Sequence, residues 1–250
     1  MHGPETIDAI APVEKEPVPF ATIFIVRHGD TEYKEERVDP DTENDLTDVG
    51  TIQIRELAER IDAEIGDGDT VYIMSSPRAR TESTARILKE TIGELGHNVV
   101  ALEGGKTSLR NFKLVDEEGR DIYTKKHDKE EYLSDMEKIF ERLEQESDYY
   151  LKYRAGTVEH SHTQNLEEYK KKIQTFLRRI IEISRERSRD NEKLILTTHG
   201  EWLDSVLELY LSRKIEKLED SASKGEAIKM EVFSDKLKFY FRGQEAVVEA

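Results

Sequence analysis

The spacing of apolar residues predicts alternating strands and helices along most of the chain. An apolar, β-rich run at 21–26 predicts a buried strand, and polar residues follow it at once. From Thr47, a predicted N-cap, apolar positions at helical spacing indicate a helix that ends near Gly66. The later predicted elements are a strand at 70–74, a helix with Ala85, Leu88, Ile92 and Leu95 on its apolar face, a strand at 98–102, a helix at 166–180, a strand at 193–198 and a helix at 202–211.

This alternation predicts a three-layer α/β/α domain at residues 21–250, built around a mainly parallel sheet. Period-two alternation around Ser234 and Asp235 predicts a C-terminal antiparallel hairpin. Residues 1–20 hold four of the six prolines and are expected to form a flexible arm. Residues 104–165 are acidic and lysine-rich, so we expect a charged helical insertion there.

Composition narrows the possible partners. Hydrophobic residues make up 36% of the 250 residues, enough for a core, while the net charge at pH 7 is −16. Such a charge opposes binding to nucleic acid or to anionic membranes, and an anionic substrate then needs a local basic pocket. There is no cysteine, and no apolar run reaches the ~20 residues that span a bilayer. We therefore expect a cytoplasmic protein.

Three predicted strands end in polar residues that are expected to share one pocket. Ligands of parallel sheets bind beyond the carboxyl ends of the strands. The first strand delivers Arg27 and His28, the second leads into the loop at 75–80, and a later one ends at His199. The topology therefore predicts one polar site at this edge of the sheet.

Four segments, in this order, resemble the motifs of the histidine phosphatase superfamily, which has the phosphoglycerate-mutase-like fold. Residues 24–31 resemble its Arg-His-Gly signature, and residues 46–50 resemble its Leu-Thr-x-x-Gly turn. Residues 75–85 are similar to its Ser-Ser-Pro-x-x-Arg-x-x-x-Thr-Ala segment, and residues 197–200 to its second histidine motif. Several motifs at the ends of the expected strands are far more specific than one short motif alone.

The resemblance implies a role for each motif residue. His28 would be the nucleophile, because a neutral imidazole nitrogen can attack phosphorus and hold the phosphoryl group covalently. Arg27 and Arg80 would stabilise the charge on the phosphoryl oxygens, and His199 would be a third donor, held as a cation at the phosphate. No metal or other cofactor is then expected. Arg78, two positions before the catalytic arginine, is expected to be a surface or lid contact.

Three further positions are expected to bind substrate. Thr31 closes the first motif, and Lys34 stands where family members commonly carry a phosphate-binding asparagine. A lysine there could contact phosphate as a point charge. The run that ends at Asn111 looks like the Leu-Arg-Glu segment that supplies the proton donor, with asparagine in place of glutamate.

An amide cannot donate the proton, so three explanations stay open: another carboxyl group acts as the acid, the alignment slips within the insertion, or the protein is weakly active. Glu201, two residues after His199, is the first candidate, although a carboxylate in the first turn of a helix is also favourable for structural reasons. The other candidates are Glu103, Glu117 and Glu118.

Three functions stay open from the sequence. The residues after Asn111 do not resemble the Arg-His-Tyr-Gly run of the mutases, which favours a phosphatase acting on a small phosphomonoester. The alternatives are a phosphoglycerate mutase and a non-catalytic protein that binds phosphorylated ligands. His160 and His162 have no evident third ligand, so no metal site is expected there. The oligomeric state is not predicted.

Overall fold

The computed structural model describes residues 17–31, 45–102, 106–110, 165–187 and 192–249. The strands are β1 (Ala21–Arg27), β2 (Thr70–Ser75), β3 (Asn98–Ala101), β4 (Glu192–Thr198), β5 (Ala227–Val232), β6 (Lys236–Phe241) and β7 (Gln244–Glu249). The α-helices are α1 (Asp48–Asp62), α2 (Ala79–Glu94), α5 (Leu166–Arg187) and α6 (Gly200–Tyr210), and the 3₁₀ helices are η1 (Thr107–Leu109) and η3 (Leu218–Asp220).

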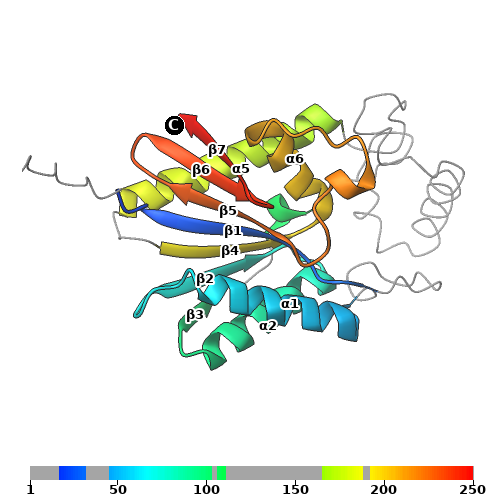
Figure 1. Cartoon of the computed structure of the whole chain (residues 1–250), viewed down its shortest axis with the longest axis vertical. Helices are drawn as coiled ribbons and strands as arrows, with labels where there is room; N and C mark the ends of the chain where they lie inside the picture. Colours follow the sequence, from blue (N-terminus) through cyan, green and yellow to red (C-terminus); the bar gives the residue numbers. More distant parts are fainter. Residues whose placement is uncertain (1–16, 32–44, 103–105, 111–164, 188–191, 250) are drawn as a thin grey trace, which may run out of the picture.

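The seven strands of the described chain form one sheet in the order β3-β2-β4-β1-β5-β6-β7. The first four in this order run parallel, whereas β5, β6 and β7 form an antiparallel meander that begins against β1. The carboxyl ends of the parallel strands point to the right in Figure 1. β1 therefore lies inside the sheet, with β4 on one edge and β5 on the other.

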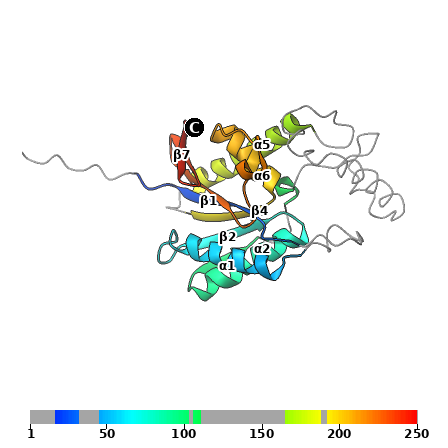
Figure 2. The ribbon, with the colours of Figure 1, turned by 45° about the vertical axis from the view of Figure 1, so that its right-hand side comes forward.

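Helices cover both faces of the sheet, which confirms the predicted three-layer architecture. α1 and α2 lie on one face, and α5 and α6 lie on the other (Figures 1 and 2). Alternate residues of β1 contribute to two separate apolar clusters: Phe24 and Val26 pack with α1 and α2, and Ile23 and Ile25 pack with α5 and α6. An apolar run without alternation is what burial on both faces requires.

The helix boundaries agree with their sequence signals in part. Thr47 is the N-cap of α1, and its hydroxyl accepts a hydrogen bond from the Gly50 amide at 3.0 Å, as predicted. α1 ends at Asp62, earlier than the predicted end at Gly66. The prediction that Leu95 lies on the buried face of its helix is wrong. α2 ends at Glu94, and Leu95 is its C-cap residue, 46% exposed.

The predicted C-terminal hairpin is antiparallel, and it continues into a third strand that the sequence pattern did not indicate. β7 is an edge strand whose glutamine and glutamates hide its alternation. Arg242 and Gly243 join β6 to β7 with φ angles of 47° and 75°. Positive φ at both central residues is the mark of a tight hairpin turn that matches the twist of its strands.

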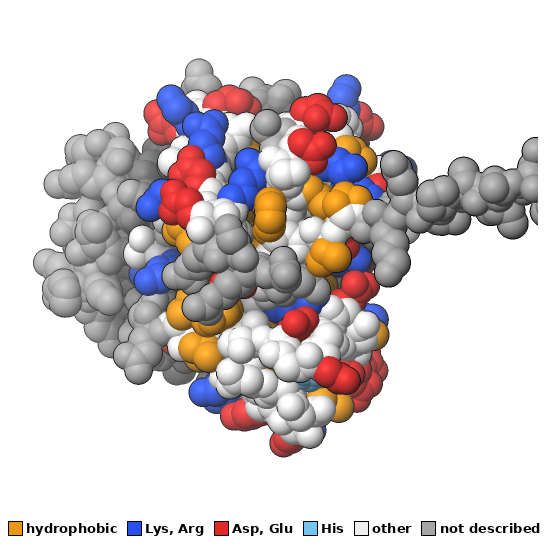
Figure 3. Space-filling model, turned by 90° about the vertical axis from the view of Figure 1, so that its left-hand side faces the viewer, with side chains coloured by type: hydrophobic (Ala, Val, Ile, Leu, Met, Phe, Trp, Pro, Cys, Tyr) orange, Lys and Arg blue, Asp and Glu red, His pale blue; other side chains and the backbone are white. Residues whose placement is uncertain are grey.

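Only part of the predicted insertion is described. Leu109 of η1 is fully buried in the core, whereas residues 111–164, which make up most of the predicted helical insertion, lie outside the described residues. None of the described helices is long and apolar enough to cross a membrane. On the side away from the carboxyl strand ends, acidic and basic side chains are interspersed (Figure 3).

Candidate active site

The carboxyl ends of three parallel strands bring together the residues of the sequence motifs. Arg80, near the start of α2, lies between two histidines that follow β1 and β4. Its Nε donates a hydrogen bond to His28 Nε2 at 3.1 Å, and its Nη2 donates to His199 Nδ1 at 3.2 Å. The two imidazole rings are 5.5 Å apart between centroids, at an interplanar angle of 69°. One guanidinium therefore bridges both histidines.

The local backbone fixes the tautomer of His28. Its Nδ1 lies 2.8 Å from the Gly29 carbonyl oxygen, which can only accept, so the ring proton is on Nδ1. Nε2 then carries a lone pair, in agreement with the hydrogen bond that it receives from Arg80. Gly29 is required here, because a Cβ at this position would lie 2.6 Å from the carbonyl oxygen of Gly50.

The surroundings of His28 keep its imidazole neutral. Burial lowers the pKa of His28 well below the ordinary value, and the positive charges of Arg80, Arg27 and Lys224 lower it further. The hydrogen bond to Gly29 opposes these effects without reversing them. At neutral pH the ring therefore presents an unprotonated nitrogen, the form that a nucleophile needs.

His199 is also neutral in this arrangement, whereas the predicted cation applies to the ring in contact with a phosphoryl group. Because Arg80 donates to Nδ1, the proton is on Nε2, which donates to the Ser76 hydroxyl at 3.0 Å. Burial and then the charge of Arg80 lower the pKa of His199 well below its ordinary value, and Arg78 and Arg27 contribute to the shift. A phosphate dianion in contact with the ring would act in the opposite direction.

Arg27 lies against the start of α6. A Cβ on Gly200 would lie 2.9 Å from the Arg27 Cζ atom, so the glycine after His199 leaves room for the guanidinium. Its Nη1 donates to the carbonyl of Ala222. Its buried Nε has no hydrogen-bond partner among the described residues, and it is therefore a donor that a ligand oxygen can use.

Arg78 is buried, which corrects its expected place on the surface. It is 2% exposed, and it occupies the N-cap position of α2, where its carbonyl accepts a hydrogen bond from the Thr81 hydroxyl at 2.8 Å. Its charge contributes to the low pKa of His199. The tight turn between β2 and α2 directs this arginine inward, and the sequence motif alone does not indicate that orientation.

Two charged residues beside His28 were missed in the sequence. Asp30 accepts hydrogen bonds from Lys224 Nζ at 2.6 Å and from the Thr47 hydroxyl at 3.0 Å, and both lower the pKa of its carboxyl group. Lys224 belongs to the segment before β5 and carries no motif of its own. Only the antiparallel return of the chain places it at this edge of the sheet.

The remaining expected residues are placed as follows. Thr31 is buried and forms an isolated antiparallel bridge with Leu46; its hydroxyl has no hydrogen-bond partner within the described parts of the chain. Glu201 is the second residue of α6 and is half-buried. Lys34 and Asn111 lie outside the described residues, as do the other candidate acids.

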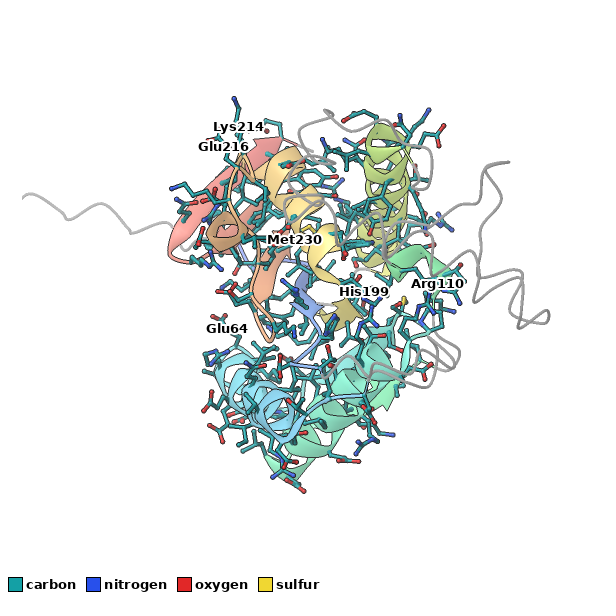
Figure 4. All side chains as sticks on the ribbon, turned by 90° about the vertical axis from the view of Figure 1, so that its right-hand side faces the viewer. Glu64, Arg110, His199, Lys214, Glu216 and Met230 are labelled. Carbon is teal, nitrogen blue, oxygen red and sulfur yellow. The ribbon has the colours of Figure 1, made fainter. Side chains whose placement is uncertain are left out.

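The segment that leads to position 111 is held at the same edge. The Thr198 hydroxyl, at the end of β4, donates to the carbonyl of Leu109 at 2.5 Å. The view onto this edge in Figure 4 labels His199 near the middle and Arg110 on one side of it. Leu109 is therefore joined directly to the end of the strand that precedes His199.

Comparisons with known proteins agree with this geometry. The family model of the histidine phosphatase superfamily (branch 1) matches residues 23–227. Phosphoglycerate mutase from Bacillus anthracis aligns with a TM-score of 0.53 over 92% of both chains at 14% identity. The mycobacterial glucosyl-3-phosphoglycerate phosphatase in complex with phosphate aligns with a TM-score of 0.55 over 90% of this chain and 97% of its own, also at 14% identity.

A structure named mycobacterial hydrolase 1 has a TM-score of 0.55 at 16% identity, over 90% of this chain and 99% of its own. No curated protein sequence matches the chain. At these identities the solved structures establish the fold alone, whereas the family model spans most of the sequence. The chain therefore belongs to the histidine phosphatase superfamily, branch 1.

Proposed function

We propose that the protein is a phosphatase that hydrolyses a small phosphomonoester through a phosphohistidine on His28. One observation carries this proposal: the proton of the His28 ring is held on Nδ1 by the Gly29 carbonyl, and the free Nε2 faces the guanidinium of Arg80. An unprotonated nitrogen beside fixed positive charge suits in-line attack on a phosphoryl group.

The proposed reaction has two steps. In the first, the His28 Nε2 lone pair forms a bond to phosphorus while the bond from phosphorus to the ester oxygen breaks, and the leaving alkoxide takes up a proton from a carboxylic acid, for which Glu201 is the candidate. As the N–P bond forms, the Arg80 Nε–H transfers its hydrogen bond from Nε2 to a phosphoryl oxygen. In the second, water attacks the phosphohistidine, which releases inorganic phosphate and restores His28.

Fixed cations stabilise the transferring group in this mechanism. Arg27 offers its buried Nε–H, and Arg80 offers the donors that now bridge the histidines. His199 would gain a proton or strengthen its donation as the phosphate charge approaches. Because guanidinium groups supply the charge that Mg²⁺ provides in other phosphoryl-transfer enzymes, we expect activity to persist in excess EDTA.

The test is direct detection of the covalent intermediate. The protein is mixed rapidly with nitrophenyl phosphate, kept at neutral or alkaline pH because phosphohistidine is acid-labile, digested and analysed by mass spectrometry. We expect the phosphate on the peptide that contains His28, and its loss together with turnover in His28→Ala. His97→Ala is the matched control, since His97 bonds Asp62 away from the site. An active protein phosphorylated elsewhere would refute the mechanism.

Asn111 favours one alternative, a non-catalytic protein that binds phosphorylated ligands, because the usual carboxylic acid is absent at that position. Tight binding of phosphate without turnover of any ester would support this alternative. A phosphoglycerate mutase would instead interconvert phosphoglycerates faster than it hydrolyses them. A screen over phosphorylated metabolites, sugars and peptides separates the three functions.

A further inference from the structure

The segment at 219–226, which runs from η3 to the start of β5, forms a wall along the end of β1. Four contacts join this wall to the strand end: Arg27 Nη1 donates to Ala222 O, Arg27 N donates to Glu226 O at 2.9 Å, Gly225 N donates to His28 O at 3.1 Å, and Lys224 Nζ pairs with Asp30 at 2.6 Å. The wall has little regular secondary structure, so its position depends on contacts with neighbouring elements, α6 and the C-terminal meander.

From the side of α6, a buried carboxylate holds the wall. Asp204 is fully buried, and its two oxygens accept hydrogen bonds from the Ser221 hydroxyl at 2.6 Å and from the Ala222 amide at 2.9 Å. The carbonyl of Ala222 is in turn the acceptor for the Arg27 guanidinium. Asp204 is therefore linked to Arg27 through a single intermediate residue, Ala222.

From the side of the C-terminal meander, a single guanidinium holds the wall. Arg242 is at the β6–β7 turn with a φ of 47°, a conformation that few non-glycine residues adopt. Its hydrogen bonds go to Glu219 O at 2.9 Å, Ser221 O at 3.0 Å, Ser223 Oγ at 3.2 Å and the two Glu226 carboxylate oxygens at 2.8 and 2.6 Å. The turn thus holds the segment that leads into β5, the strand that pairs with β6.

We propose that Asp204 and Arg242 are positioning residues that aim the Arg27 guanidinium at the phosphoryl group through the wall at 219–226. This inference rests on the proposed function. Neither residue needs to touch the substrate, since both bind the wall whose Ala222 carbonyl accepts the hydrogen bond from Arg27. A displacement of about 1 Å at a group that orients a reacting centre can lower the rate about a hundredfold.

The main variant is Arg242→Asn. Asparagine tolerates positive φ, and Asn-Gly is a favoured hairpin turn, so the meander is retained while the guanidinium is lost. We expect kcat/KM for nitrophenyl phosphate to fall at least tenfold, and the affinity for inorganic phosphate, measured by calorimetry, to fall as well. Asp235→Asn removes a charge from the other turn of the same meander and is expected to change kcat/KM less than twofold.

Asp204 is tested by a graded pair of variants. Asp204→Asn keeps an acceptor for the Ala222 amide and a group that can pair with the Ser221 hydroxyl, so it is expected to retain more activity than Asp204→Leu. Glu208→Gln is the control on the same helix, because Glu208 pairs with Lys170 at 3.1 Å and not with the wall. Circular dichroism and thermal unfolding show which variants are folded.

A double-mutant cycle separates positioning from a general structural effect. In an Arg27→Ala background, Arg242→Asn should lower kcat/KM by less than twofold further, since its effect passes through the missing arginine. An equal loss in both backgrounds, or a folded Arg242→Asn protein with full activity and phosphate affinity, would overturn this inference alone. A wild-type protein that neither hydrolyses the ester nor binds phosphate would overturn the proposed function, and this inference with it.

Discussion

At the scale of single residues, the candidate site depends on which nitrogen carries each proton. Arg80 can only donate hydrogen bonds, so its contacts with His28 Nε2 and His199 Nδ1 make both atoms acceptors. Burial, and then the charge of Arg80, lowers the pKa of His28 and keeps its Nε2 unprotonated. In the proposed mechanism the same arginine then binds the phosphoryl group that this nitrogen accepts.

The two arginines of the β2–α2 turn are expected to differ in their effect on rate. Arg80→Ala removes donors that face both histidines, and loss of one such donor typically lowers kcat about a hundredfold to a thousandfold. Arg78→Ala removes a buried charge near His199 and leaves the bridge that Arg80 forms between the two histidines in place, so we expect a loss at least tenfold smaller. Steady-state kinetics with nitrophenyl phosphate compare them, and equal losses would contradict the assignment of Arg80.

Glu201 is our proposed proton donor in place of the expected glutamate at position 111. If it protonates the leaving oxygen, Glu201→Gln should slow alkyl phosphates strongly and spare nitrophenyl phosphate, whose leaving group needs little protonation. The ratio of kcat/KM for the two esters measures the effect. Uniform slowing of both esters would indicate a structural role in the first turn of α6, and no slowing would direct the search to Glu103.

At the scale of the elements, two glycines lie where chain segments approach each other closely. Substitution of one is expected to lower activity, and substitution of the other is expected to lower stability. A Cβ on Gly200 meets the end of a flexible arginine side chain, whereas a Cβ on Gly50 would lie 2.2 Å from the Asp30 backbone oxygen. The first clash can be relieved by moving Arg27, and the second can be relieved only by moving the chain.

Gly200→Ala is therefore expected to lower kcat/KM at least tenfold while the melting temperature changes by a few degrees at most. Gly50→Ala is expected to lower the melting temperature markedly, because backbone atoms of two elements must separate. Differential scanning calorimetry and nitrophenyl phosphate kinetics on the same preparations provide the comparison. A Gly200→Ala protein with full activity would show that the position of Arg27 is not critical.

The sequence predicted those elements and site residues whose signals are local. Buried strands that end in motif residues, and the Thr47 N-cap, are readable from apolar spacing and turn chemistry. Lys224, Asp204 and Arg242 were not found, because their approach to β1 depends on the antiparallel return of the chain and on a turn with positive φ. The orientation of Arg78 likewise depends on the turn that α2 makes after β2.

At the scale of the whole molecule, the buried histidines link folding to pH. Burial, and then the charge of Arg80, lowers the pKa of both His28 and His199 in the folded protein, while the unfolded chain keeps the ordinary value of 6.5. As pH falls below this value, the unfolded state binds protons that the folded state does not, so it is favoured. The stabilisation is complete above about pH 6.5 and is lost progressively below it.

We therefore expect the free energy of unfolding to fall between pH 7.5 and pH 5, and to fall less in His199→Gln than in the wild-type protein. Urea denaturation at the two pH values measures this difference. A His199→Gln protein with the same loss as the wild type would mean that this histidine does not contribute to the linkage.

The central place of β1 has a consequence for synthesis on the ribosome. Both sheet partners of this strand, β4 and β5, are encoded in the last quarter of the sequence. At a synthesis rate of about 5–20 residues per second, β1 remains without a partner strand for roughly ten to thirty seconds until β4 has been made. During that time both of its edges can pair with other chains. Translation that stops before β4 therefore yields an aggregation-prone polypeptide that contains His28 but has no pocket around it.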